Sequence, residues 1–218
     1  MPDLSEEAAL RAAHGLGPEA PVAGIDEAGR GPCAGPVVAA AALLPPDGLP
    51  PELASTLDDS KKIAPPRRLE LFEALTAPGT LAGWAVAEAS VAEIDRINIL
   101  QASLLAMRRA VAALPVAPAG ALVDGNQDPT LGLPTATLVK GDSRSLSIAA
   151  ASILAKVARD RLMGELAAHH PGYGWETNQG YGSAAHLTAI RTLGVTIHHR
   201  RSFAPVRAVL ELTLDIES

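Results

Sequence analysis

Short apolar runs separated by turn residues constrain the fold of this chain more than any other feature of its sequence. Two such runs, "APVAGID" and "GPVVAAAALL", follow each other directly and are typical of neighbouring strands. The stretch "LAGWAVAEAS" is typical of a third strand. Two later stretches, "GALVDG" and "TATLVKGD", also indicate strands, and each is expected to end in an aspartate. The chain therefore contains a sheet whose first two strands are adjacent in sequence.

Helical segments alternate with these strands. "APPRRLELFEALT" has prolines in its expected first turn, where a missing amide proton costs little. Ser90 and Glu93 form a capping-box pattern that opens a long helix reaching about Leu114. Further helices are expected at "SLSIAAASILAKVARDRLMGELAAHH", at "SAAHLTAIRTLG" and near residues 204–213. This order predicts an α/β or α+β domain, a mixed β-sheet with helices packed on it.

The composition suits one globular domain. The chain has 218 residues, of which 48% are hydrophobic, enough for a sizeable core. No apolar run approaches the roughly 20 residues needed to cross a bilayer, and the acidic N-terminus lacks the features of a secretory signal. We therefore expect a cytoplasmic protein. Residues 1–20 are expected to form a short helix outside the main fold, and Cys33, the single cysteine, is expected to serve in packing.

The net charge of −6 does not indicate a nucleic-acid-binding protein. Binding of metal by four acids would reduce this charge to −2, however. The basic residues also occur in clusters: Lys61 with Lys62, Arg67 with Arg68, Lys140 with Arg144, and Arg200 with Arg201. The composition is therefore compatible with a polyanionic partner.

Four acids fall where strands are expected to end. Asp26 and Glu27 end the first strand, Asp124 ends "GALVD", and Asp142 follows "TATLVKG". If these strands are neighbours, their ends bring the carboxylates to one point. Ligands that offer only oxygen suit Mg²⁺ or Mn²⁺ rather than zinc. Because adjacent residues of a strand point to opposite faces, we expect the strand to end at Asp26 or the Glu27 side chain to curl back.

Each acid also has a purely structural interpretation. Asp26 and Glu27 can be turn residues ahead of Gly29, and Asp124 in "DGN" can form a tight turn. Asp142 can be a helix N-cap, in competition with nearby serines. The pattern of residues alone leaves the metal site and these structural roles about equally supported.

Two glycine-bearing loops are candidate ligand-binding segments. In "EAGRGPCAGP", Arg30 lies between Gly29 and Gly31, and the loop lacks the lysine of a P-loop. An arginine beside carboxylates fits a phosphate-bearing substrate, and a glycine turn with a solvated arginine fits equally well. In "NQGYGSAAH", Tyr181 can present its ring to a sugar or base, or be a partly buried loop residue. The histidines are expected to be capping or solvated residues.

Taken together, these segments resemble the ribonuclease HII family, the type 2 ribonucleases H. The resemblance runs from about residue 22 to about residue 206. It rests on "GIDEAGRGPCAGPVVAAA", "DSKK", "INILQASLLAM", "LVDGN", "KGDSRSLSIAAASILAKVARDRLM", "GYGS" followed by His186, and "HHRRSFAPV". The glycine–arginine–glycine form distinguishes it from type 3 enzymes, which typically have lysine there.

The resemblance implies a ribonuclease H-like mixed β-sheet flanked by helices, with a helical C-terminal subdomain. The corresponding division is an N-terminal extension at 1–20, a catalytic core at 21–165, and a subdomain at 166–218 that completes the substrate site. The implied activity is hydrolysis of the RNA strand of RNA–DNA hybrids, and cleavage 5′ of single ribonucleotides embedded in duplex DNA. The implied cofactor is Mg²⁺ or Mn²⁺, two ions per site. The implied products carry 3′-hydroxyl and 5′-phosphate ends.

The resemblance also assigns roles to residues that match its motifs. The metal-binding catalytic acids are Asp26, Glu27, Asp124 and Asp142. The residues expected to bind substrate are Gly29, Arg30 and Gly31 at the ribose 2′-hydroxyl and phosphates, Tyr181 at the RNA-to-DNA junction, and Lys61 and Lys62 at the backbone. Gln179 and Ser183 depart from the lysine and threonine usual in the family, which leaves one phosphate contact open. We expect a monomer, and no sliding-clamp-binding sequence is evident in "LELTLDIES".

Three other functions compete with this one. A general metal-dependent nuclease of the same fold would share the acids but not the test for ribose. A non-catalytic hybrid-binding protein would need a broken acid set, whereas all four acids are present. A phosphate-binding module built on the glycine loop lacks the P-loop lysine.

Overall fold

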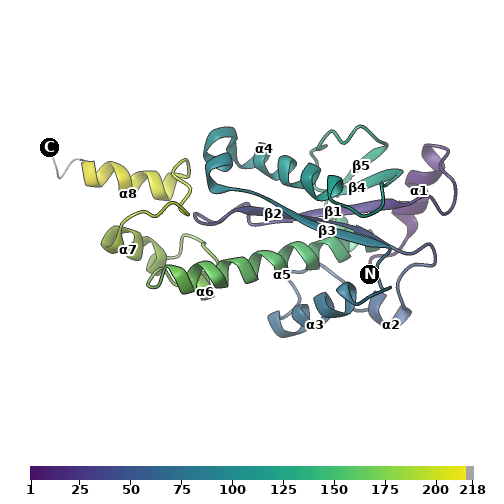
Figure 1. Ribbon diagram of the computed structural model, residues 1–218, viewed down its shortest axis with the longest axis horizontal. Coiled ribbons are helices and arrows are strands. Elements are labelled where there is room, and N and C mark those ends of the chain that lie inside the picture. The colour runs from purple at the N-terminus through teal and green to yellow at the C-terminus, as the bar shows by residue number, and fades with distance from the viewer. Residues whose placement is uncertain (215–218) are drawn as a thin grey trace.

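A computed structural model describes residues 1–214, with side chains described up to residue 211. Its centre is a five-stranded mixed sheet in the order β3-β2-β1-β4-β5 (Figure 1). The strands are β1 (Val22–Ala28), β2 (Val37–Leu43), β3 (Gly83–Ala89), β4 (Gly120–Asp124) and β5 (Thr135–Leu138). β1 pairs antiparallel with β2 and parallel with β4. The expected mixed sheet is therefore confirmed, with its first two strands side by side.

The helices follow the sequence patterns closely. The described helices are α1 (Ser5–Ala13), α2 (Pro51–Ala54), α3 (Pro65–Thr76), α4 (Val91–Ala112), α5 (Leu146–His169), α6 (Trp175–Asn178), α7 (Ala184–Leu193) and α8 (Ala204–Leu214). Ser90 and Glu93 form the expected capping box at the start of α4. That helix is kinked at Asn98, whose φ of 66° lies outside the helical region. Gly194 ends α7 with a φ of 84°.

The two long helices cover opposite faces of the sheet (Figure 1). Alternate residues of β2 divide between them: Ala39 and Ala41 belong to the core under α4, and Ala40 and Ala42 to the core under α5. Small side chains let the helices approach the sheet closely. At Gly24 a Cβ atom would lie 2.1 Å from the backbone of Ser147, so only glycine allows the first turn of α5 to pack against β1.

The C-terminal helices α6, α7 and α8 lie beyond one end of the sheet (Figure 1). They pack with the end of α5 in a separate apolar cluster around the fully buried Trp175. The division of the chain at residue 165 stays a prediction. Within residues 1–214, no helix is both long and apolar enough to cross a membrane. The last four residues of "LELTLDIES", in which no clamp-binding sequence was evident, lie outside the described residues.

The N-terminal helix forms as expected but does not lie outside the main fold. Leu10 is buried, and the Glu7 carboxylate, 2% exposed, accepts hydrogen bonds from Ser145 Oγ, Ser147 Oγ and Ser147 N. The backbone of Asp3 also pairs with residues 144–146. These are tertiary contacts at the start of α5, and the local sequence of residues 1–20 gives no sign of them.

Candidate active site

Asp26 and Glu27 lie inside β1 rather than after it. The strand continues to Ala28, and all three residues pair with β2. Of the two alternatives expected for this pair, the one in which the strand ends at Asp26 is therefore wrong. On the other side of β1, however, pairing with β4 stops at Ile25. Since β2 continues the ladder while β4 ends, the two acids lie beside an open sheet edge without leaving the strand.

The strand alternation sends the two carboxylates to different faces. Asp26 shares a face with Gly24, which meets α5. Glu27 shares a face with Ile25, which belongs to the core under α4. Both still line one cavity, together with residues 28–31 and Tyr181, because the sheet is open beyond β4. Glu27 therefore reaches the site around the end of a neighbouring strand.

Asp124 and Asp142 border a second, adjoining cavity. Asp124 is the last residue of β4, and its Oδ1 accepts a hydrogen bond from Gly141 N at 2.7 Å. Asp142 lies in a 3₁₀ turn, Gly141–Ser143, which follows Lys140 in the left-handed conformation. Lys61 lines both cavities, so the two pairs of acids lie on either side of one lysine.

Asp142 neither ends a strand nor caps a long helix. β5 ends at Leu138, so Asp142 does not end a strand. The N-cap of α5 is Ser145, whose side chain accepts a hydrogen bond from Ile148 N. Asp142 therefore does not cap α5, so capping does not account for its position beside Asp124.

The electrostatics of this region disfavour the ionised acids. Burial raises the pKa of Asp26 well above its usual value, and the charges of Glu27 and Asp124 add to the effect. Burial also raises the pKa of Glu27, against the influence of Arg30, and the pKa of Asp142. Burial alone would lower the pKa of Lys61, but the charge of Asp26 and those of other nearby acids raise it overall. The site therefore carries negative charge that its own lysine offsets only in part.

The unpaired oxygens fit a divalent cation. Glu27 Oε1 accepts a hydrogen bond from Arg30 at 3.2 Å, whereas Oε2 is buried and has no partner. Asp26 Oδ1 accepts from Glu27 N at 2.6 Å. Among the residues whose side chains the structure describes, no three His, Cys, Asp or Glu side chains are grouped closely enough to hold a metal ion. The donor set nevertheless suits a hard cation, because it is all oxygen and its negative charge is only partly offset by Arg30 and Lys61.

The glycine–arginine–glycine loop lies against Tyr181. Gly29 has a φ of +97°, and a Cβ there would lie 1.9 Å from Arg159 Nε. A Cβ on Gly31 would lie 3.3 Å from the Tyr181 ring. The ring is 53% exposed and lines the cavity of Asp26, so Tyr181 is not the partly buried loop residue of the alternative interpretation. Arg30 is ion-paired with Glu27 rather than only solvated.

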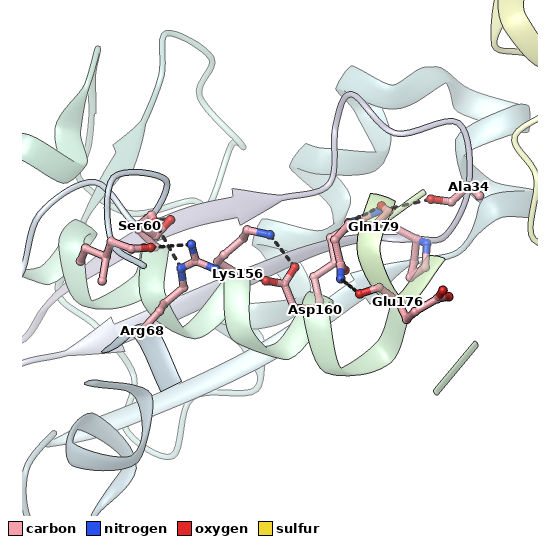
Figure 2. Close-up of polar contacts among 11 residues, drawn as sticks. Ala34, Ser60, Arg68, Lys156, Asp160, Glu176 and Gln179 are labelled. Atoms are coloured by element: carbon pink, nitrogen blue, oxygen red, sulfur yellow. Dashed lines mark hydrogen bonds and ion pairs between the residues drawn. The ribbon is translucent and has the colours of Figure 1, made fainter. Parts of the chain in front are cut away.

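Lys61 and Lys62 lie on the loop between α2 and α3. Lys61 lines both cavities, and Lys62 lines the second and pairs with Asp58 at 3.1 Å. The loop is held by Arg68, which is buried and donates hydrogen bonds to the carbonyl oxygens of Ser60 and Ile63 (Figure 2). Both lysines are therefore placed beside the acids by a fixed loop.

Three polar residues that line the first cavity were given no role from the sequence. Lys156 and Arg159 of α5 line the first cavity, as does Ser60. Figure 2 shows Lys156 directed at Asp160, whose other oxygen accepts a hydrogen bond from Arg68. Ser60 lies in the matching stretch "DSKK", and Lys156 and Arg159 lie in the charged run "AKVARD" of a helix that is otherwise largely buried, but neither stretch singled these residues out.

Two histidines differ from the expectation that they are capping or solvated. His186 and His199 are 0% and 1% exposed, and their rings pack with Trp175 and Tyr173. Burial lowers the pKa of both, that of His199 to about 4. Both are therefore neutral parts of the C-terminal core, and their hydrogen bonds lead back to Tyr181.

Comparisons with known proteins agree with this architecture. Residues 23–206 match the family model described as Ribonuclease HII. The chain is 60% identical to a protein named Ribonuclease HII from Paramagnetospirillum magneticum, over 85% of this chain and 90% of that one. It is 57% identical to the protein of the same name from Rhodospirillum rubrum, over 96% and 92% of the two chains. The crystal structure of ribonuclease H2 from Pyrococcus horikoshii OT3 superposes with a TM-score of 0.74 at 28% identity, covering 88% of this chain and 98% of that one.

Proposed function

This chain belongs to the ribonuclease HII family, metal-dependent endoribonucleases that cut the RNA strand of RNA–DNA hybrids, and on that premise we propose a finer activity for it. The enzyme also cuts 5′ of single ribonucleotides embedded in duplex DNA, leaving 3′-hydroxyl and 5′-phosphate ends. The observation that carries the proposal is a shared cavity: Asp26 and Glu27 line it together with the Gly29–Gly31 loop and Tyr181. The acids proposed to cut the strand and the loop residues proposed to select the cutting position thus line the same cavity.

Asp26, Glu27, Asp124 and Asp142 are the proposed metal ligands. Two divalent ions, Mg²⁺ or Mn²⁺, would supply an activated water and stabilise the departing 3′-oxygen. Asp26 lies on the central strand β1 and would be the ligand shared by both ions. Besides burial, the negative charges of three other acids raise the pKa of Asp26: those of Glu27, Asp124 and Asp142. This supports a place for Asp26 within the cluster.

The Gly29–Gly31 loop is the proposed reader of the 2′-hydroxyl, the group that distinguishes RNA from DNA. No side chain on either glycine keeps a sugar away from the backbone. Arg30, whose side chain is 50% exposed, is placed to contact a neighbouring phosphate. Tyr181 packs against the following sugar, where a 2′-hydroxyl would be in the way. This accounts for a preference for an RNA-to-DNA junction.

Lys61 and Lys62 are the proposed contacts to the nucleic-acid backbone. Lys61 lies between both pairs of acids, and its charge partly offsets theirs before substrate binds. The same charge attracts the phosphates on either side of the cut. Gln179, which stands where the family usually has lysine, donates a hydrogen bond from its side chain to the carbonyl oxygen of Glu176 (Figure 2).

The test is a set of labelled duplexes that differ at one sugar. One contains a single ribonucleotide, a second the same position as 2′-deoxy, and a third as 2′-O-methyl. With Mg²⁺ or Mn²⁺ present, only the ribonucleotide duplex should be cut. Cleavage of the 2′-deoxy duplex would contradict the proposed ribose test and favour a general metal-dependent nuclease.

A further inference from the structure

The segment His198–Arg200 supports the two loops of the proposed specificity site, which are the Gly29–Gly31 loop and the loop that carries Tyr181. Its backbone pairs with the residues that follow the glycine–arginine–glycine loop: Gly35 N donates to His198 O at 2.9 Å, and Arg200 N donates to Cys33 O at 2.8 Å. The result is a short antiparallel bridge between Ala34 and His199. This segment belongs to the C-terminal part of the chain and touches none of the four acids by any hydrogen bond found among the described residues.

Arg200 fixes the glycine–arginine–glycine loop. Its guanidinium is fully buried. It donates hydrogen bonds to four carbonyl oxygens, those of Gly29 at 2.6 Å, Arg30 at 3.1 Å, Gly35 at 2.8 Å and Pro36 at 3.1 Å. Two of these belong to the peptide units proposed to meet the ribose. The orientation of both units is therefore set by one side chain.

The cost of this arrangement shows that Arg200 does more than fill space. Burial, together with the nearby charge of Arg159, lowers its pKa to about 9. None of its hydrogen bonds within residues 1–214 goes to a carboxylate, although a buried charge is normally paired with one. An apolar side chain would avoid this cost but would remove the donor to the carbonyl oxygens of Gly29, Arg30 and Gly35, whereas Pro36 O would keep its hydrogen bond from Arg159.

The neighbouring residue, His199, fixes Tyr181 through a chain of hydrogen bonds whose proton positions follow from the partners. Thr196 N donates to His199 Nδ1 at 3.0 Å, so the ring proton of His199 is on Nε2. His199 Nε2 lies 3.2 Å from His186 Nε2, which also accepts from Trp175. His186 must then carry its proton on Nδ1, which donates to Tyr181 O at 2.8 Å.

The two loops also fit tightly against each other. A Cβ on Gly31 would lie only 3.3 Å from the Tyr181 ring, a closer approach than most packed side chains make. Cys33 N donates to Gly180 O at 2.8 Å, which joins the loops directly beside Tyr181. A shift of either loop by a few tenths of an ångström would therefore change the space between them.

We propose that His199 and Arg200 are positioning residues that set the distance between the Gly29–Gly31 loop and Tyr181, and so set the preference for an RNA-to-DNA junction. The inference rests on the proposed roles of that loop and of Tyr181. Neither positioning residue touches the substrate. Each acts through a backbone carbonyl of a residue that does.

The test compares Arg200→Lys with Arg201→Lys. Arg201 is the adjacent, exposed arginine, so the control has the same chemistry one residue away. The measurement is the ratio of kcat/KM for a single-ribonucleotide duplex to kcat/KM for a long RNA–DNA hybrid. Arg200→Lys should lower this ratio about tenfold, because a misplacement of about 1 Å can cost about a hundredfold in rate. Arg201→Lys should leave it unchanged. A purely structural role would lower both rates together and keep the ratio, which would overturn the inference.

A second pair of variants tests the histidine arm and guards against loss of folding in Arg200→Lys. His199→Gln keeps a donor toward His186, whereas His199→Leu removes it. The ratio should be kept by His199→Gln and lowered by His199→Leu, and equal ratios in the two variants would overturn the inference. Tyr181→Ala separates the two levels of the proposal. If it leaves the ratio unchanged, the stacking role itself is wrong; if it lowers the ratio while Arg200→Lys and His199→Leu do not, only the positioning role is wrong.

Discussion

At the scale of single residues, Asp26 carries the conflict between stability and function. Its carboxylate is buried on the central strand beside other acids, which raises its pKa well above the usual value. At neutral pH the charged form is therefore unfavourable in the folded protein without a cation. The buried charge of Asp26 lowers the stability of the folded protein, and it is useful only when metal and substrate are bound.

Asp26→Asn should therefore melt at a higher temperature than the wild type in EDTA at pH 7. A group whose pKa is raised on folding loses stabilising effect as the pH rises, so removing its charge is favourable there. Adding Mg²⁺ or Mn²⁺ should raise the melting temperature of the wild type, and much less that of the variant. Equal metal-induced shifts in both proteins would contradict the assignment of Asp26 as a ligand.

His199 gives a pH dependence of the opposite sign. Burial and the nearby histidines His186, His198 and His170 lower its pKa to about 4. Arg200, another basic side chain, is the next residue in the chain. Between about pH 6.5 and pH 4 the unfolded chain binds a proton that the folded protein refuses, so the free energy of unfolding should fall as the pH falls through this window. The loss should be about 2–3 kcal/mol.

Urea unfolding at pH 7.5 and pH 5 measures this loss. His199→Gln, which cannot titrate there, should lose less free energy of unfolding than the wild type between the two conditions. The carboxylates are common to both proteins and cancel in the comparison. Identical losses would show that His199 is not held neutral by the fold.

At the scale of elements, α5 joins the loops of the site to the sheet. Its residues Lys156 and Arg159 line the first cavity, and Asp160 holds Lys156 on one side and Arg68 on the other (Figure 2). Arg68 in turn fixes the loop that carries Lys61. The position of Lys61, the proposed substrate-binding lysine, thus depends on contacts between two helices.

Arg68→Met should lower the free energy of unfolding by about 2 kcal/mol, because the buried guanidinium makes hydrogen bonds to two carbonyl groups and a carboxylate. It should also raise KM more than it lowers kcat, since Lys61 loses its fixed place. Arg67→Met is the matched control, because Arg67 is exposed on the same helix and pairs only with Glu70. Thermal melts and steady-state kinetics check both effects. Equal behaviour of the two variants would contradict the role of Arg68.

Most elements were predictable because their signals are local. The capping box at Ser90, the prolines opening α3 and Gly194 closing α7 act within one helical turn, and each lies where the sequence indicated. The errors come from long-range pairing. β1 continues past Asp26 because β2 continues beside it, and α1 docks because Glu7 meets the two serines of α5.

The site was predictable for motif residues whose chemistry is recognisable, and not for Arg159, His199 and Arg200, which lie in matching stretches but received no role. The acids, the glycine–arginine–glycine loop and Tyr181 were all placed beforehand, and the structure brings them to two adjoining cavities. The residues that support them were not. Arg159, Arg200 and His199 are polar groups in buried segments, and their partners are backbone carbonyls and rings that only the fold brings near.

At the scale of the whole molecule, charge is distributed to suit a polyanion despite the net charge of −6. The acids are gathered at the open sheet edge, and Arg30, Lys61 and Lys156 line the same cavity. A nucleic-acid backbone would meet cations on the way to the acids. The net charge does not reveal this arrangement, because acidic and basic side chains line the same cavity.

Lys61→Gln should weaken binding of a hybrid duplex and reduce its dependence on salt. Each phosphate contact contributes roughly 0.9 to the slope of log K against log salt concentration on a duplex, so the slope should fall by about one unit. Arg67→Gln, at a residue that lines neither cavity, should leave the slope unchanged. Binding is measured in EDTA to prevent cleavage. An unchanged slope in Lys61→Gln would remove this residue from the substrate surface.

The most direct test of the central claim is to map the cut in a duplex that contains one ribonucleotide. The strand is labelled, incubated with Mg²⁺ or Mn²⁺, and the ends of the products are identified. The account predicts one cut on the 5′ side of the ribonucleotide, leaving a 3′-hydroxyl and a 5′-phosphate. Asp124→Asn should bind the duplex and barely cut it. Cleavage that persists in excess EDTA, or a cut on the 3′ side with a cyclic phosphate end, would contradict the account.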